Sequence, residues 1–120
     1  MNSVGKSAED IACEYLEANG FTIIERNWRY HHLEVDIIAL DKSHPPLIHF
    51  IEVKGRVAPA FIDPAEQVGP SKQKNLIRAA GGYLKKKKVS NEVVFDICTI
   101  LFKTKGYEIS FIKNAFTPLW

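Results

Sequence analysis

The chain has 120 residues, of which 46% are hydrophobic and 25% charged, and this composition fits one compact domain spanning residues 1–120. No apolar stretch approaches the roughly 20 residues that span a bilayer, and the first residues lack the apolar segment of a secretory signal, so we expect a cytoplasmic protein without membrane contact. The formal net charge of +2 divides unevenly, because residues 1–53 hold 4 Lys/Arg and 9 Asp/Glu, whereas residues 54–120 hold 12 and 5.

Apolar residues at helical spacing predict an amphipathic helix of about four turns at the start of the domain. Asn2 or Ser3 can cap the beginning of this helix, and Gly20 is well placed to end it with a positive φ. The inward stripe of the helix consists of Ala8, Ile11, Ala12, Tyr15 and Leu16.

Three strands are expected next, at residues 21–28, 33–40 and 47–54, following one another as a meander. A turn at residues 29–32 joins the first two strands, and a loop with two adjacent prolines joins the second to the third. Residues 55–70 contain three prolines and predict a long irregular loop beside the third strand.

A second helix is expected with Ser71 as its N-cap, and the glycine pair at residues 81–82 indicates close packing against the sheet. A buried strand at residues 93–102 follows, and residues 103–120 supply a turn, an edge strand at 107–112 and a tail. The inward stripe of the second helix consists of Leu76, Ile77, Ala80 and Leu84.

The second and third strands of the meander place three carboxylates and a lysine inside apolar sequence, where charge is costly unless something binds it. Alternation with period two puts Glu34 and Asp36 on one face of their strand, and Glu52 and Lys54 on one face of theirs. If the two strands pair as a hairpin, these charges converge into an oxygen-rich site that suits Mg²⁺ or Mn²⁺. The alternative is an ordinary solvated strand face with cross-strand ion pairs.

The basic half of the chain favours a polyanionic partner such as DNA, since cations neutralise phosphates while carboxylates hold a metal. Lysines at a helix end also complement the helix dipole and keep a protein soluble, and this second interpretation stays open. The cations concerned are Lys72, Lys74, Arg78 and the run Lys85–Lys88.

Several other polar residues are weaker candidates. Glu9 lies either at the edge of the buried helix stripe or in solvent, and Gln73 leans inward on the second helix, from where it could reach the charged site. Asp96 interrupts an apolar strand and is expected to be a hydrogen-bonded structural carboxylate. All four histidines are expected to be non-catalytic, and His49 faces away from Glu52 by strand parity. The two cysteines form no CxxC pair and are expected to be small buried hydrophobes.

The order of these elements, with Asp on the second strand and Glu-x-Lys on the third, resembles the PD-(D/E)xK nuclease superfamily. That resemblance implies an α/β, restriction-endonuclease-like αβββαβ core with a mixed central sheet flanked by helices. Motifs along residues 5–102 resemble the YraN-like family of predicted endonucleases, which is similar to archaeal Holliday-junction resolvases. Two positions depart from the family pattern, Leu33 in place of Gly and Gly55 in place of Thr. The motifs are Gly5-Lys6-Ser7-Ala8-Glu9-Asp10, Glu25-Arg26-Asn27-Trp28-Arg29, Glu34-Val35-Asp36, Phe50-Ile51-Glu52-Val53-Lys54-Gly55-Arg56, Lys72-Gln73-Lys74, Ala80 with Tyr83-Leu84, and Phe95-Asp96.

Carried over position by position, the resemblance implies that Asp36 and Glu52 ligate Mg²⁺ or Mn²⁺, with the Val53 carbonyl as a further ligand. Lys54 would orient the attacking water and stabilise developing negative charge. The remaining implied roles are secondary carboxylates at Glu9 and Glu34, a site-facing amide at Gln73, and phosphate contacts at Arg26, Arg56 and Lys72.

The leading hypothesis is therefore a metal-dependent endonuclease that hydrolyses phosphodiester bonds in DNA, with branched DNA among its candidate substrates. A homodimer would suit such an enzyme, because related resolvases cut paired strands. Two other hypotheses stay open. One is a nucleic-acid-binding protein that retains the nuclease fold without catalysis, and the other is a structural domain whose carboxylates form surface pairs.

Overall fold

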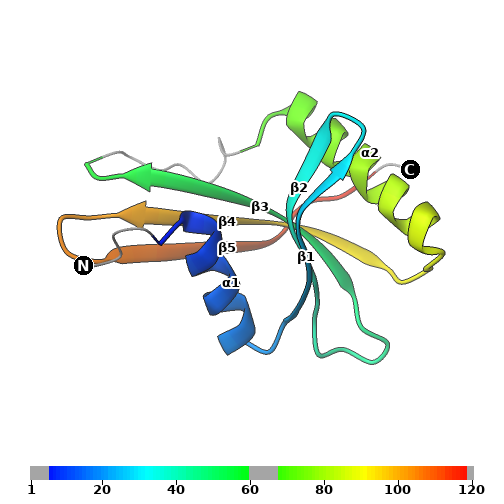
Figure 1. The fold of residues 1–120 in the computed structure, drawn as a ribbon, viewed down its shortest axis with the longest axis horizontal. Coiled ribbons are helices and arrows are strands. Elements are labelled where there is room, and N and C mark those ends of the chain that lie inside the picture. Colours follow the sequence, from blue (N-terminus) through cyan, green and yellow to red (C-terminus); the bar gives the residue numbers. More distant parts are fainter. Residues whose placement is uncertain (1–5, 60–67, 119–120) are drawn as a thin grey trace.

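A computed structural model describes residues 6–59 and 68–118, and in this part of the chain two helices flank a five-stranded sheet (Figure 1). The strands lie side by side in chain order, and neighbours are antiparallel except β3 and β4, which are parallel and joined through α2. This mixed α/β arrangement confirms the predicted fold class. The elements are α1 (Ala8–Ala18), β1 (Thr22–Tyr30), β2 (Leu33–Leu40), β3 (Ile48–Val57), α2 (Pro70–Lys87), β4 (Val93–Phe102) and β5 (Tyr107–Phe116).

α1 is shorter than predicted, and a different residue caps it. Its 11 residues make about three turns. The N-cap is Ser7, whose hydroxyl accepts from the Asp10 N–H at 3.0 Å while the Asp10 carboxylate accepts from the Ser7 N–H at 3.3 Å. This reciprocal capping box starts the helix after the predicted caps Asn2 and Ser3, which lie outside the described residues. Gly20 follows the helix with φ +91°, as predicted.

α2 begins two residues earlier than predicted. Pro70 is its first residue and Gly69 is its N-cap, so Ser71 does not have the predicted capping role. Proline suits the first turn because its missing N–H would have no intrahelical partner there. Gly82 does pack closely against the sheet, since a Cβ placed on it would lie 2.4 Å from the ring of Tyr30 in β1. Of the described helices, neither is both long and apolar enough to cross a membrane.

Three strands run further than the sequence predicts. β1 continues to Tyr30, through half of the expected turn, and β5 continues to Phe116. β3 extends to Val57, into the segment expected to be a loop, because its parallel ladder with β4 continues that far. Backbone pairing with a neighbour therefore outweighs the polar sequence at these strand ends. Residues 60–67 of the expected loop lie outside the described residues.

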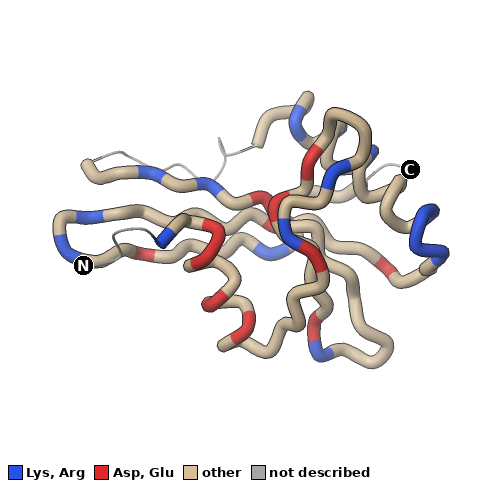
Figure 2. Tube along the Cα trace, viewed as in Figure 1, with Lys and Arg blue, Asp and Glu red and all other residues tan. Residues whose placement is uncertain are grey.

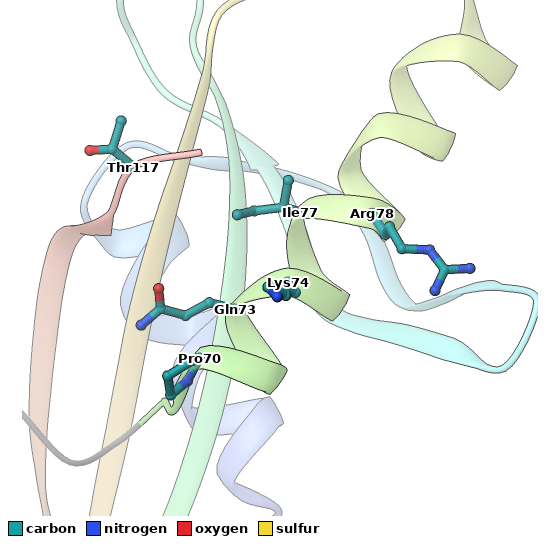
Figure 3. Close-up of a pocket in the computed structure, with 6 residues that line it drawn as sticks. All are labelled: Pro70, Gln73, Lys74, Ile77, Arg78 and Thr117. Atoms are coloured by element: carbon teal, nitrogen blue, oxygen red, sulfur yellow. The ribbon is translucent and has the colours of Figure 1, made fainter. Parts of the chain in front are cut away.

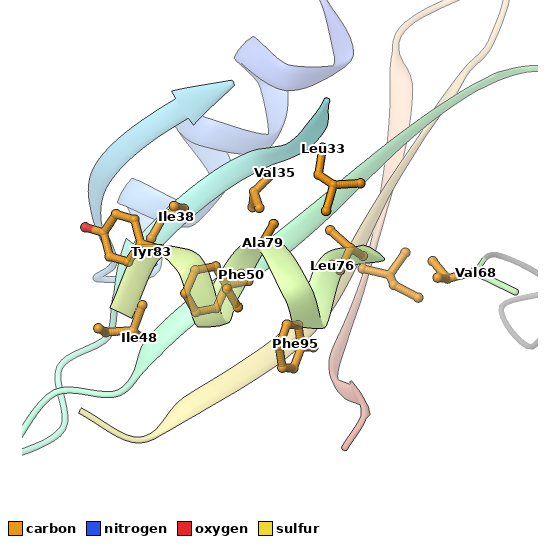
Figure 4. Packing of buried hydrophobic residues seen from close by; sticks show 12 residues of the cluster. Leu33, Val35, Ile38, Ile48, Phe50, Val68, Leu76, Ala79, Tyr83 and Phe95 are labelled. Atoms are coloured by element: carbon orange, nitrogen blue, oxygen red, sulfur yellow. The ribbon is translucent and has the colours of Figure 1, made fainter. Parts of the chain in front are cut away.

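Buried apolar side chains form two clusters on opposite faces of the sheet, one under each helix (Figure 4 shows the cluster under α2). Alternation along β3 separates them, because Phe50 joins the cluster under α2 whereas Ile51 joins the cluster under α1. Both cysteines are free and buried, as predicted. The α2 cluster includes Leu76, Ala79, Tyr83, Val35, Phe50 and Phe95, and the α1 cluster includes Ile11, Ala12, Leu16, Ile37, Ile51 and Cys98.

His49 of β3 is buried between two carboxylates on the α1 face of the sheet. Its Nδ1 lies 2.5 Å from Asp96 Oδ2 in β4, and its Nε2 lies 2.8 Å from Asp41 Oδ2 in the loop after β2. The other Asp96 oxygen accepts from the Asn114 N–H of β5 at 2.8 Å. Asp96 is therefore a hydrogen-bonded structural carboxylate, as predicted, and this network ties three strands and a loop together.

The network favours a charged imidazole ring. Burial disfavours the charged form of His49, but its hydrogen bonds to Asp96 and Asp41 outweigh burial and raise the pKa of His49. Burial also opposes charge on Asp41, yet the bonds from His49 and from two backbone N–H groups of the loop hold the pKa of Asp41 well below its usual range. The imidazole ring is thus hydrogen-bonded to a carboxyl group on each side, inside the protein.

His49→Ala should lower the free energy of unfolding by about 3–5 kcal/mol near pH 6, because it leaves buried carboxylates without their cation. Since the folded pKa of His49 is raised, its charge stabilises fully below the unfolded value of about 6.5, and this contribution is lost as pH rises through the folded pKa. Denaturant unfolding across this pH range measures the effect, with His32→Ala in the exposed turn as control. A loss that does not shrink at high pH would contradict the charged ring.

Gly82→Ala should destabilise the protein by about 1–3 kcal/mol although alanine favours helices, because the new methyl group overlaps the Tyr30 ring. Combining Gly82→Ala with Tyr30→Ala should cost less than the sum of the two single changes, since the ring that clashes is gone. Unfolding free energies of the four proteins in this cycle measure the coupling, and strict additivity would rule out the contact.

Candidate functional site

The candidate site lies where β2 separates from β3. The antiparallel ladder between these strands ends at the pair Ile37 and Ile51. Beyond it, the Val53 N–H donates to Asp36 Oδ2 at 2.8 Å, so a side chain replaces the missing backbone partner. In an extended strand the carbonyl of a residue points to the same side as its N–H, so the Val53 carbonyl faces the same opening.

The strict alternation predicted for β2 is wrong at Asp36. Val35 packs in the cluster under α2, whereas Ile37, two residues later, packs in the cluster under α1. Asn27 lies opposite this position in β1 and has φ +52°, which marks a local distortion of the paired strands. Because the strand changes face here, period-two counting does not establish that Glu34 and Asp36 share a face.

Glu52 is the most buried carboxylate of the site, with 5% of the residue exposed. Its Oε2 lies 3.7 Å from Lys54 Nζ, as strand parity predicts, and 3.4 Å from Lys72 Nζ of α2. Its Oε1 is buried and has no hydrogen-bond partner among the described residues. Leaving such an oxygen unpaired costs free energy, and its position is one that a bound cation would satisfy.

The neighbouring Glu52 disfavours ionisation of Asp36. Burial is the main cause that raises the pKa of Asp36, and the Glu52 charge raises it further. The Val53 N–H and the Lys72 charge act in the opposite direction, and the resulting pKa of Asp36 is about 6. The site therefore holds a proton in the range where an ordinary aspartate is ionised, and a divalent cation would relieve the same repulsion.

Two further carboxylates lie on the edge of this charge cluster. Burial and then the charge of Asp36 raise the pKa of Glu9 in α1. Glu34 Oε2 lies 3.7 Å from Arg29 Nη2. Within residues 6–59 and 68–118, no three His, Cys, Asp or Glu side chains come close enough together to hold a metal ion. Asp36 and Glu52 would thus need further oxygens, such as the Val53 carbonyl or water, to complete a cation site.

The two arginines predicted to contact phosphate differ in their surroundings. Arg26 Nη2 lies 2.8 Å from Asp10 Oδ1 and 3.8 Å from Glu9 Oε1, so it holds α1 against β1 and neutralises part of the acidic cluster. Arg56 is exposed towards the end of β3 and donates to the Gly55 carbonyl at 2.9 Å. Of the two, Arg56 is the one available to an incoming anion.

The structure places two α2 residues differently from the sequence interpretation. Gln73 Nε2 donates to the Val68 carbonyl at 3.1 Å, and it is Lys72, the preceding residue, that reaches Glu52. Asn27 is a site residue that sequence reasoning missed, since its side chain interacts with the Glu9 carboxyl and offsets part of the rise in the pKa of Glu9. The available signal was an asparagine inside a strand, because Asn tolerates positive φ better than most residues.

Opposite charges gather in different parts of the molecule, as Figure 2 shows. Acidic residues lie along α1 and near the place where β1 and β2 cross β3 in this view. Basic residues lie towards the free ends of β3 and the β4–β5 hairpin, and three lysines, Lys85–Lys87, occupy the last turn of α2. Basic residues thus lie on both sides of the place where β1 and β2 cross β3 (Figure 2), and the three lysines also complement the negative end of the helix dipole.

These features define an α/β protein with a half-buried carboxylate pair and an adjacent lysine at a sheet opening. Residues 8–100 match the family model described as "Uncharacterised protein family UPF0102", and the chain belongs to this family. The matched segment contains every candidate site residue named above.

Relatives of the chain cover nearly its whole length. A UPF0102 protein of Bacteroides thetaiotaomicron is 38% identical over 117 residues, covering 98% of this chain and 94% of the relative. A UPF0102 protein of Clostridium perfringens is 41% identical over 117 residues, covering 95% and 93%. A UPF0102 protein of Chlorobaculum parvum is 42% identical over 122 residues, covering 94% and 91%. The family name states no activity, so function is argued from the site.

Asp36→Asn should stabilise the metal-free protein near pH 8 by up to about 3 kcal/mol, because the folded pKa of Asp36 lies about two units above its ordinary value. A raised carboxyl pKa means that stability falls as pH rises from about 4 to about 6, whereas asparagine has no proton to lose in this range and still accepts from the Val53 N–H. Urea unfolding in EDTA near pH 4 and near pH 8 measures the difference. Glu17→Gln, exposed on α1, should change little, and a less stable Asp36→Asn protein near pH 8 would contradict the pKa shift.

Proposed function

We propose that this protein is a metal-dependent endonuclease that hydrolyses phosphodiester bonds in DNA. The observation that carries the proposal is the convergence of Asp36, Glu52 and Lys54 where β2 leaves β3, with one buried Glu52 oxygen unpaired among the described residues. These three residues are also the core of the resemblance to PD-(D/E)xK nucleases. A solvated surface of paired charges accounts poorly for a carboxylate that is 5% exposed.

The donor set fits a hard divalent cation. Asp36, Glu52 and the Val53 carbonyl would hold Mg²⁺ or Mn²⁺ through oxygen, and water or a phosphate oxygen would supply the remaining ligands. When bound, such a cation polarises a phosphoryl oxygen and lowers the pKa of a bound water. Asp36 must lose its proton to serve as a ligand, so cation affinity should rise with pH through about 6.

Lys54 is held beside the cation position by Glu52, and its side chain is 24% exposed. It can therefore orient a water and donate hydrogen bonds to phosphate oxygens as negative charge develops on them. Lys72 reaches the same Glu52 oxygen from α2, and Arg56 lies further along the open end of β3. These two cations suit phosphates on either side of the bond to be cut.

The carboxylates at the edge have a supporting role in this proposal. Glu9, with its raised pKa, can hold water by hydrogen bonding near Asp36, and Glu34 can do so from β2. Arg26 is engaged by Asp10 and Glu9, so it positions Glu9 rather than meeting the substrate first. Gln73 is hydrogen-bonded to the Val68 carbonyl and would contact a neighbouring nucleotide.

A nucleic-acid-binding protein without catalysis is the second candidate function. It is favoured by the small number of acidic ligands, since the described residues bring together no third carboxylate with Asp36 and Glu52. This candidate predicts DNA binding that weakens with salt, needs no metal and leads to no cleavage.

Cleavage of duplex, single-stranded and branched DNA with Mg²⁺ or Mn²⁺ tests the proposal. Lys54→Met, which keeps the length of the side chain and removes its charge, should lower the cleavage rate by about 10²–10³-fold because it removes a donor to the developing charge. Lys105→Met, at an exposed lysine between β4 and β5, is the matched control and should cut at nearly the normal rate.

Metal binding is measured separately, by titration calorimetry with Mn²⁺ on the normal chain and on Asp36→Asn. A heat of Mn²⁺ binding that is present in the normal chain and absent in Asp36→Asn supports the cation site. Cleavage that survives both Asp36→Asn and Lys54→Met would overturn the proposed chemistry. Salt-sensitive binding with no cleavage of any substrate would select the second candidate.

A further inference from the structure

A cavity lies between α2 and the segment that follows β5 (Figure 3). Its volume is about 450 Å³, which is in the range of about 300–1,000 Å³ typical of small-molecule sites. Gln73 is part of its wall and directly follows Lys72, the α2 residue that reaches Glu52. The lining residues are Pro70, Gln73, Lys74, Ile77, Arg78 and Thr117.

The cavity carries two positive charges that form no ion pair with a carboxylate of the described residues. Lys74 and Arg78 are exposed and lie one helical turn apart on α2. Among the described residues, no carboxylate lies within 4.0 Å of either cation, whereas Lys54 and Lys72 both pair with Glu52. The first turn of α2 also has no acidic residue to offset the positive end of its dipole. This rim is suited to an anion such as a phosphate.

The wall of the cavity suits a planar ring with polar edges. In Figure 3, Gln73 and Ile77 point from α2 towards the segment that carries Thr117. Ile77 and Pro70 supply apolar surface, which a bare phosphate ion would not use. Gln73 uses one N–H on the Val68 carbonyl and keeps its carbonyl oxygen and second N–H, and Thr117 adds a hydroxyl. A ring with hydrogen-bonding edges and an attached phosphate matches all of these groups.

We propose that this cavity binds a nucleotide, with the base against Ile77 and Pro70 and the phosphate at Lys74 and Arg78. The inference rests on the proposed function in one respect, because a strand that passes Lys72 on its way from the carboxylate pair would deliver such a nucleotide into the cavity. The same chemistry is offered by a free nucleoside monophosphate. In either case the base is held out of a helical stack, and the cavity contributes affinity that does not depend on a metal.

Binding to the full chain in EDTA tests the inference, with NMR titration of backbone amides as readout. The probes are thymidine 5′-monophosphate, thymidine, inorganic phosphate and a short oligothymidylate. The monophosphate or the oligothymidylate should shift the NMR resonances of the backbone amides of residues 73–78. Lys74→Gln/Arg78→Gln should weaken this binding at least about tenfold, because two charge-assisted contacts are lost. Lys42→Gln/Lys105→Gln removes the same charge from exposed lysines outside α2 and should change nucleotide binding less than about twofold.

The probes separate the sources of the ligand. If only the oligothymidylate shifts these amides, and Lys74→Gln/Arg78→Gln weakens its binding, the ligand is a nucleic-acid strand. If the monophosphate binds equally well, a free nucleotide also fits the cavity. Phosphate binding as tight as nucleotide binding, equal losses in both double variants, or no response to either nucleotide probe would overturn the inference. DNA cleavage without pocket binding would contradict this inference alone, whereas pocket binding without cleavage would contradict the proposed nuclease alone.

Discussion

The hydrogen bond from the Val53 N–H to Asp36 is the contact on which the candidate site depends. It ends the ladder between β2 and β3 without leaving a buried N–H unpaired, so the two strands can diverge inside the protein. The same contact brings the Asp36 carboxyl next to Glu52, where burial and the neighbouring charge raise its pKa to about 6. The opening in the sheet and the unusual acidity of the site therefore have one origin.

β3 can carry this site because it is anchored on both faces and along one whole edge. Its parallel ladder with β4 continues to Val57 after β2 has left, which keeps the Glu52 and Lys54 positions rigid. On the α1 face, His49 bonds to carboxylates on either side of its ring and fixes the start of the strand. On the other face, Glu52 Oε1 is buried without a hydrogen-bond partner among the described residues. A fully hydrogen-bonded network on one face and an unsatisfied oxygen on the other are the pattern expected of a structural face and a binding face.

Local patterns predicted most of the fold but failed at particular residues. The bounds of β2 and β4 and the shared face of Glu52 and Lys54 follow from strand periodicity, and the structure confirms them. Ser7 was missed as a cap because several polar residues near the N-terminus could have capped a helix. The change of face at Asp36 was also missed, since period-two counting assumes an undistorted strand and Asn27 distorts this one.

By itself, the sequence determined the order of helices and strands, the α/β class and the short list of carboxylates and cations from which a site could be built. These follow from hydrophobic spacing and turn residues, which act over a few positions along the chain. Only the tertiary structure decided that Asp36 meets Glu52, that Lys72 rather than Gln73 reaches this pair, and that Lys74 and Arg78 border a cavity with Thr117. These contacts join segments far apart in the chain, and strand divergence and helix placement depend on packing that no local pattern encodes.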